Sequence, residues 1–112
     1  MSERIRRKMV VRRMVGNGTS TRMGVWVWRL GEGYLVGHPN ELYSDLQRQL
    51  RSRFPNRAIA AMNLVNGGIG YLPPAHLYDL DLYQVWQSPF GRGSLERVIE
   101  AAGAAIEKLG AP

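Results

Sequence analysis

The sequence predicts an α+β or α/β domain with a small mixed sheet, about three helices and a C-terminal helix packed on the sheet. Segments rich in β-branched and aromatic residues alternate with segments whose apolar residues recur every three or four positions. A helix followed by a mostly apolar run of strand length is typical of a sheet covered by helices. The 112 residues are enough for a single small domain.

The chain begins with a basic segment that is expected to be helical. Residues 2–14 have Ser2 as a candidate N-cap, and the glycine-containing run 16–21 breaks the helix. We therefore divide the chain into a basic helix and linker at 1–22 and one α+β domain at 23–112. The apolar residues expected on one side of this otherwise basic helix are Ile5, Met9, Val10 and Met14.

The next segments predict a hairpin, a helix and a further strand. Residues 24–30 and 34–37 are β-branched and aromatic, and the turn Gly31-Glu32-Gly33 between them indicates a β-hairpin. Asn40 is a candidate N-cap for a helix that ends before Pro55. The apolar residues that repeat four apart along that helix are Leu42, Leu46, Leu50 and Phe54. The mostly apolar run 57–65 then has the length of a strand.

The last third of the chain contains the clearest helix. A short helical turn is expected at 75–80 and another strand at 82–86. Ser94 is expected to cap the final helix, which Gly110 ends and in which Gly103 costs about 1 kcal/mol relative to alanine. The residues that form its apolar stripe are Leu95, Val98, Ile99, Ala102, Ile106 and Leu109.

Composition excludes several classes of protein. With 45% hydrophobic residues and 21% charged residues, the chain can bury enough surface to fold, and disorder is not expected. The absence of cysteine excludes a disulfide scaffold and a cysteine-based zinc finger. No apolar run reaches the roughly 20 residues of a membrane helix, and the charged start does not resemble a signal peptide. A cytoplasmic location is the default expectation.

Positive charge is concentrated at the beginning of the chain. The net charge is +6, and eight of the fifteen basic residues lie in the first 29 positions, opposed there only by Glu3. Such a cluster can bind the phosphates of nucleic acid or anionic lipid. It can equally be a solvated helix face or can pair with acidic residues of another segment. Trp26 and Trp28, on one face of their strand by alternation, are a candidate docking surface.

Common catalytic motifs are absent. The sequence has no P-loop, GxGxxG, HExxH or GxSxG pattern. His38 and His76 are its only histidines, and a zinc site built from these two and carboxylates has little support from their spacing. Both are expected to be ordinary, partly exposed histidines.

Two segments resemble the neutral/alkaline, non-lysosomal ceramidase family. Gly37-His38-Pro39-Asn40-Glu41 is similar to the family's strand-to-helix passage, in which Pro-Gly-Glu opens a helix. About 25 residues later the chain resembles the family's Asn-Gly-Tyr-x-x-Tyr segment, a following tyrosine-containing turn and a Ser-Pro-Phe loop before a final helix. The matching residues there are Asn66, Gly67, Tyr71, Tyr78, Tyr83, Ser88, Pro89 and Phe90.

The resemblance implies a zinc-dependent amidohydrolase. In that family two histidines, a glutamate and a tyrosine hold a catalytic zinc, which activates water to hydrolyse the N-acyl bond of ceramide. The glutamate corresponds to Glu41 and the tyrosine to Tyr71, which would also lie close to the developing oxyanion. Both histidine ligands come from family segments that precede anything matching this sequence. The resemblance therefore implies the C-terminal segment of a larger hydrolase, inactive alone, with the upstream part of that hydrolase or an oligomer as partner.

Three residues depart from the family's pattern. Asn40 replaces the motif glycine, Gly68 stands where the first tyrosine of the pair is expected, and Gln84 replaces a frequent glutamate. Without the resemblance, Glu41 would be a first-turn carboxylate and Tyr71 a half-buried aromatic whose hydroxyl bonds a backbone carbonyl. The alternative function is a stand-alone basic module that binds nucleic acid or an acidic protein.

Overall fold

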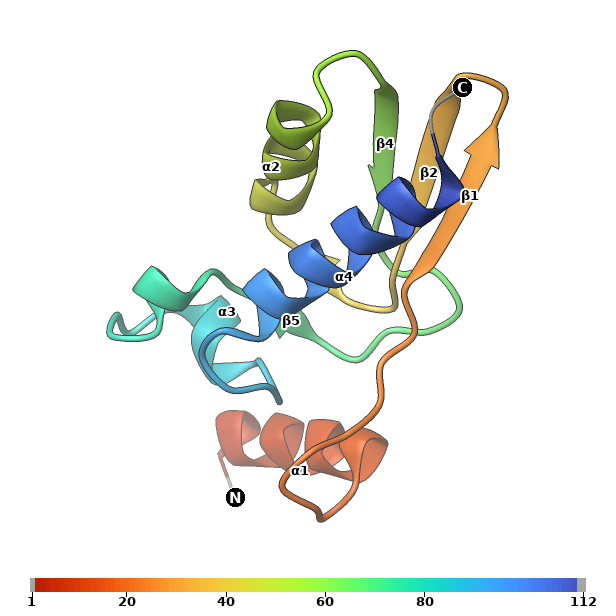
Figure 1. The fold of residues 1–112 in the computed structure, drawn as a ribbon. Helices are drawn as coiled ribbons and strands as arrows, with labels where there is room; N and C mark the ends of the chain where they lie inside the picture. Colours follow the sequence, from red (N-terminus) through yellow and green to blue (C-terminus); the bar gives the residue numbers. More distant parts are fainter. Residues whose placement is uncertain (1, 111–112) are drawn as a thin grey trace.

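The computed structural model describes residues 2–110, in which helices cover one face of a three-stranded sheet (Figure 1). The strand order is β1-β2-β4, formed by Trp26–Leu30, Gly33–Gly37 and Ala58–Met62. β1 and β2 form the expected antiparallel hairpin, and β2 and β4 run parallel, so the sheet is mixed. This architecture confirms the α+β class predicted from the sequence.

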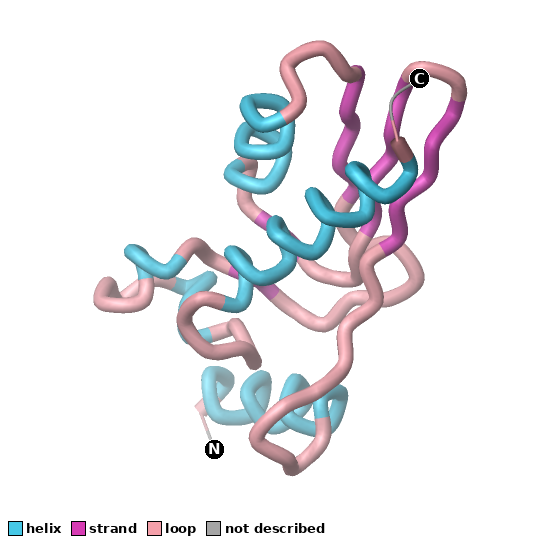
Figure 2. Tube along the Cα trace, viewed as in Figure 1, coloured by secondary structure: helices cyan, strands magenta, loops and turns pink. Residues whose placement is uncertain are grey.

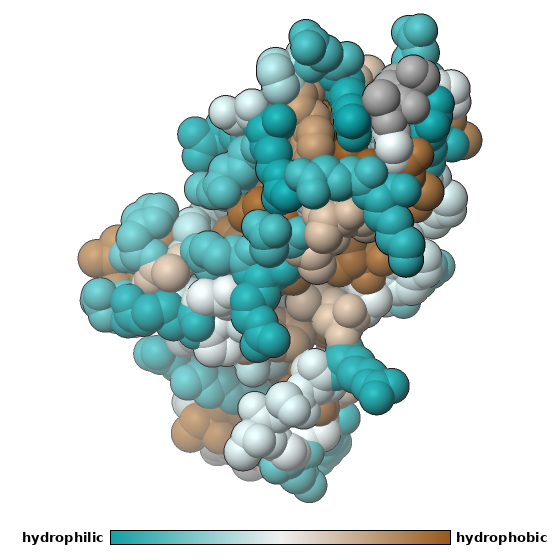
Figure 3. Space-filling view, in the orientation of Figure 1, coloured by the Kyte–Doolittle hydropathy of each residue, from teal (hydrophilic) through white to brown (hydrophobic). Residues whose placement is uncertain are grey.

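Two helices supply the covering layer. α2 (Asp45–Arg53) lies beside β4, and α4 (Ser94–Leu109) crosses the sheet diagonally, as predicted for the C-terminal helix (Figure 1). The predicted apolar stripe of α4 is buried except for Leu109, which is 41% exposed. The outer sides of both helices are mostly hydrophilic (Figure 3). The core between the layers consists of Tyr34, Val36, Leu46, Leu50, Phe54, Ile59, Leu72, Leu95, Val98, Ile99, Ala102 and Ile106.

A second, very small sheet lies at the end of the first. β3 (Glu41–Leu42) and β5 (Tyr71–Leu72) pair in parallel, with Glu41 opposite Tyr71. The chain then forms a 3₁₀ turn, η1 (Ala75–Leu77), and a single helical turn, α3 (Tyr83–Trp86), on the same side as β5 (Figure 2).

The helix expected to begin after Asn40 begins only at Asp45, so that part of the prediction is wrong. Asn40 is fully buried, and its side-chain amide donates to the Gly70 carbonyl at 3.3 Å instead of capping a helix. Asp45 is the acidic residue of the first turn, and it pairs with Arg48 at 3.3 Å. Glu41 is therefore a strand residue and not the first-turn carboxylate of a helix.

The strand expected at 82–86 is also wrong, because Tyr83–Trp86 is the helical turn α3. The Leu82 carbonyl accepts the N–H groups of Val85 and Trp86, each at 3.1 Å, which closes the turn locally. The Tyr83 and Trp86 rings also pack edge to face at 4.8 Å, a contact that helical spacing allows.

α4 differs from its prediction at two positions. Ser94 is its first residue, and the N-cap is Gly93, whose φ of 91° is readily adopted only by glycine. Gly103 leaves the space that the Arg53 guanidinium occupies, which a Cβ would enter. Arg53 pairs there with Glu100 at 3.4 Å and with Glu107 at 2.8 Å. The cost of glycine in the helix therefore accompanies a cross-link between α2 and α4.

The basic helix α1 (Glu3–Val15) forms as predicted, and the Ser2 hydroxyl accepts from the Ile5 N–H at 3.3 Å. No side chain of α1 is buried. The residues expected on its apolar side, Ile5, Met9, Val10 and Met14, are 43–56% exposed and do not face the rest of the chain. The half-buried Val11 and Val15 instead border a cavity with Val85 and Pro89. Within residues 2–110, no helix combines the length and the apolar character needed to cross a membrane.

Ile99 tests the packing of α4 on the sheet. It is 8% exposed within the core, so Ile99→Asp should place a charge there without a partner and lower the free energy of unfolding by about 3 kcal/mol or more. Denaturant unfolding measures this change. Ala104→Asp, at an exposed position of the same helix, should change it by about 0.5 kcal/mol or less. Equal stabilities of the two variants would contradict the packing.

Candidate functional site

Backbone hydrogen bonds join the segment after β2 to the loop between β4 and β5. Within this contact, residues 38–40 accept from the loop, and Glu41 donates back to it. The four bonds run from Val65 N to His38 O at 2.9 Å, Ile69 N to Pro39 O at 2.9 Å, Leu64 N to Asn40 O at 3.2 Å and Glu41 N to Gly70 O at 3.0 Å. These four hydrogen bonds continue into the pairing of β3 with β5. Together they set the positions of Glu41 and Tyr71.

The loop can bend this sharply because several of its residues adopt positive φ. Asn66 has a φ of 56°, which asparagine tolerates, and Gly70 has a φ of 94°. Leu64 has a φ of 57°, an unfavourable conformation for leucine that the surrounding bonds maintain. The Asn63 side chain also joins the two segments. Its Oδ1 accepts from the Leu42 N–H and its Nδ2 donates to the Leu42 carbonyl, each at 3.4 Å.

Glu41 and Tyr71 lie opposite each other across this junction, and both are half-buried. Burial raises the pKa of Tyr71, and the Glu41 carboxylate beside its hydroxyl raises the pKa further, both as a charge and as a hydrogen-bond acceptor. The two residues singled out by the sequence therefore come together, although 29 positions separate them. A carboxylate and a phenol at one spot can offer two oxygen ligands to a cation.

Tyr83 also belongs to this cluster, which sequence reasoning missed. Its ring meets the Tyr71 ring edge to face at 5.8 Å, and it is 40% exposed. The family resemblance included Tyr83 without giving it a role, and the expected strand at 82–86 gave it no place beside Tyr71. The turn α3 brings it there. The cluster thus has a second phenol, although Gly68 lacks the hydroxyl expected at its position.

Part of the basic helix α1 packs against Tyr83 and Trp86. Arg7 Nη1 donates to the Tyr83 hydroxyl at 2.7 Å, and the Arg4 guanidinium lies 4.8 Å from the centre of the Trp86 ring. Arg4 also approaches Asp81 at 3.9 Å. These two arginines therefore contact residues of the chain itself.

The two histidines lie in very different environments. His76 is exposed, but His38 is fully buried, so the expectation of a partly exposed side chain is wrong for His38. Its Nδ1 accepts from the Asn40 N–H at 3.4 Å, which leaves the proton of the neutral ring on Nε2, where it meets no protein acceptor. Burial lowers the pKa of His38 to about 4.

The metal-ligand set is incomplete in the described part of the chain. Residues 2–110 contain no group of three or more His, Asp or Glu side chains arranged to hold a metal ion. Gly68 is exposed and has room for a side chain, since the nearest atom to an added Cβ is Leu64 Cδ2 at 3.6 Å. Gln84 follows Tyr83 within α3.

In comparisons with known proteins, no family model, no curated protein and no solved structure matches the chain.

Gly70 tests how the backbone fixes Tyr71. With a φ of 94° and an added Cβ only 3.1 Å from the Gln87 carbonyl oxygen, Gly70→Ala should lower the free energy of unfolding by about 2 kcal/mol. It should also shift the NMR resonances of Tyr71. Gly68→Ala is the matched control, because its backbone and its space accept a methyl group. If Gly68→Ala costs as much as Gly70→Ala, the backbone account is wrong.

His38 makes stability depend on pH. Its pKa is about 4 when folded, against about 6.5 in an unfolded chain, so between these values only the unfolded chain binds the proton. Stability should therefore fall as the pH falls from about 6.5 to about 4, by a total on the order of 3 kcal/mol from this residue. Urea unfolding at several pH values measures the slope. His38→Gln should remove this part, and an unchanged slope would contradict it.

Proposed function

We propose that this chain is part of a ceramidase-like, zinc-dependent amidohydrolase and provides two ligands of its metal site. The observation that carries the proposal is the β3–β5 pairing, which places the Glu41 carboxylate beside the Tyr71 phenol. These are the residues that the resemblance assigns to zinc. Both side chains are half-buried, and neither belongs to the hydrophobic core.

The donor set fits part of a zinc site. A catalytic zinc is held by three or more protein ligands and keeps one position open for water. Glu41 and Tyr71 provide two oxygens. His38 is buried with its Nδ1 engaged by Asn40, and His76 lies on η1 rather than at the β3–β5 junction. The histidine ligands of the proposed site therefore come from polypeptide outside this chain.

The chain's own residues have distinct roles in this proposal. Zinc, when bound, supplies a Lewis acid and lowers the pKa of a water molecule so that it can attack an amide. Glu41 contributes negative charge, and Tyr71 contributes a phenol oxygen near the carbonyl that becomes the oxyanion. Tyr83 accepts from Arg7 through its oxygen, so its own proton remains free for an acceptor on the substrate.

The same geometry supports the proposal that the isolated chain has no amidase activity. Two oxygen ligands hold zinc weakly, and residues 2–110 contain no group of three or more His, Asp or Glu side chains that could hold the ion. Hydrolysis of ceramide or of another N-acyl amide then requires the missing ligands. The contacts of Arg4 and Arg7 with Trp86 and Tyr83 favour packing over nucleic-acid binding for that part of the basic cluster.

A zinc titration of the isolated chain, followed by NMR, tests the proposal. Weak, saturable shifts centred on Glu41 and Tyr71 are expected, with affinity weaker than micromolar and no amidase activity. Glu41→Gln and Tyr71→Phe should each abolish the shifts by removing a ligand oxygen. Glu32→Gln, at an exposed carboxylate in the β1–β2 turn, should leave them unchanged.

Two results would contradict the proposal. Shifts centred on other residues would show that the Glu41–Tyr71 pair is not a metal site. Stoichiometric zinc binding at micromolar affinity that survives Glu41→Gln would show that other ligands of this chain hold the ion.

A further inference from the structure

The two faces of the three-stranded sheet differ in what covers them but not in polarity. Residues on one face, such as Tyr34, Val36 and Ile59, are buried under α2 and α4. By strand alternation, nine positions point to the other face, in three rows set by the strand register. These rows are Trp26–Gly37–Met62, Trp28–Leu35–Ala60 and Leu30–Gly33–Ala58. All nine residues are apolar, and none is charged or polar.

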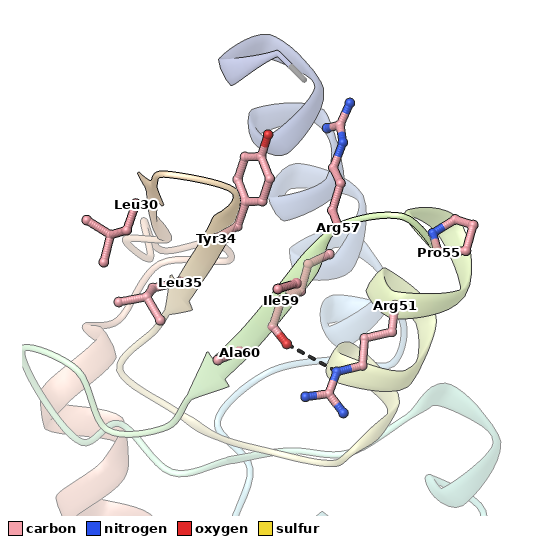
Figure 4. Close-up of a pocket in the computed structure, with 10 residues that line it drawn as sticks. Leu30, Tyr34, Leu35, Arg51, Pro55, Arg57, Ile59 and Ala60 are labelled. Atoms are coloured by element: carbon pink, nitrogen blue, oxygen red, sulfur yellow. Dashed lines mark hydrogen bonds between the residues drawn. The ribbon is translucent and has the colours of Figure 1, made fainter. Parts of the chain in front are cut away.

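This second face, which we call the open face, is accessible in the single chain except at Gly37, which is buried against the Val65 side chain. Leu30 is 63% exposed and Trp28 is 39% exposed, and both alanines of β4 are exposed as well. Figure 4 shows Leu30 and Leu35 on the side of the sheet opposite to Tyr34 and Ile59. Sheets with one face in water carry polar residues on that face, whereas sheets covered on both sides are apolar throughout. The open face has the composition of a covered one.

Its shape is complementary to itself. β1 carries the bulky side chains, while β2 and β4 carry Gly33, Ala58 and Ala60, which line a hollow of about 570 Å³ together with Leu30 and Leu35 (Figure 4). Arg51, Pro55 and Arg57 also line this hollow. A two-fold axis parallel to β2 would lay β1 of one chain over β4 of another. The protruding Trp28 and Leu30 of each copy would then fill the hollow of the other, with the two Leu35 side chains meeting on the axis.

We infer that the open face is an interface between two copies of this chain, packed sheet to sheet. The inference goes beyond the proposed function and does not depend on the metal site. In an isologous contact the same surface lies on both subunits, so a charged residue near the two-fold axis would meet its own copy. The nine apolar residues of the open face carry no charge and avoid this repulsion. Two sheets that pack in this way form a shared apolar layer about 10 Å thick, as in a β-sandwich.

α2 hinders association through the edge of β4. Gln47 Oε1 accepts from the Ala61 N–H at 3.0 Å, and Arg51 Nε donates to the Ile59 carbonyl at 3.1 Å, so α2 occupies the outward backbone groups of this strand (Figure 4).

Sedimentation equilibrium of the native chain tests the interface. A dimer of about twice the 12.6 kDa chain mass is expected at micromolar concentrations. Leu30→Lys should weaken association at least tenfold, because two buried lysines would lose their hydration. Leu80→Lys makes the same change at a position that is 52% exposed and off the open face, and it should leave the dimer intact.

A second measurement reports the geometry without relying on the stability of a charged variant. The chain has no cysteine, so Leu35→Cys introduces a single thiol at the proposed axis, and a bis-maleimide reagent that spans about 10 Å should link two chains efficiently. Leu80→Cys should not link at low concentration. A native chain that stays monomeric at high micromolar concentration overturns the inference. A dimer that Leu30→Lys leaves intact, or that Leu35→Cys does not link faster than Leu80→Cys, overturns it as well.

Discussion

The backbone bonds between residues 38–41 and 64–70 are the constraint on which the rest of the site depends. They carry the chain from the three-stranded sheet into the small β3–β5 sheet, and they leave Glu41 and Tyr71 opposite each other. Because the groups involved are mostly backbone N–H and C=O, the contact requires particular conformations more than particular side chains. Gly70 and Asn66 supply the positive φ values, and Leu64 adopts one against its preference.

Elements whose stability is local were predictable from the sequence. The helices near each terminus and the β1–β2 hairpin could be located from local composition, turn residues and the glycines that end the helices, although Gly93 and not Ser94 caps α4. β3 and α3 could not be located in this way. Leucines four apart predicted a helix from Asn40, but the buried bonds of Asn40 and Glu41 to the Gly70 carbonyl override that periodicity. A partner 30 residues away has no trace in a local pattern.

Local sequence patterns did not predict that Glu41 and Tyr71 lie together. Periodicity alone made Glu41 a first-turn carboxylate, while the resemblance paired it with Tyr71, and the structure places the two together. Tyr83 was missed because its helical turn was expected to be a strand. The burial of His38 was missed because it follows from the loop that covers it, whose Val65 N–H bonds the His38 carbonyl. Both errors concern tertiary contacts.

Native-state hydrogen exchange tests most directly whether the backbone bonds between residues 38–41 and 64–70 form one cooperative unit with the three-stranded sheet. We predict that the amides of Glu41, Val65 and Ile69 exchange only through global unfolding. Their free energy of opening should equal that of the Val36 amide in β2. Exchange of these three amides through a local opening several kcal/mol below the global value would contradict it. In that case the loop would move independently of the sheet, and no fixed backbone contact would hold Glu41 beside Tyr71.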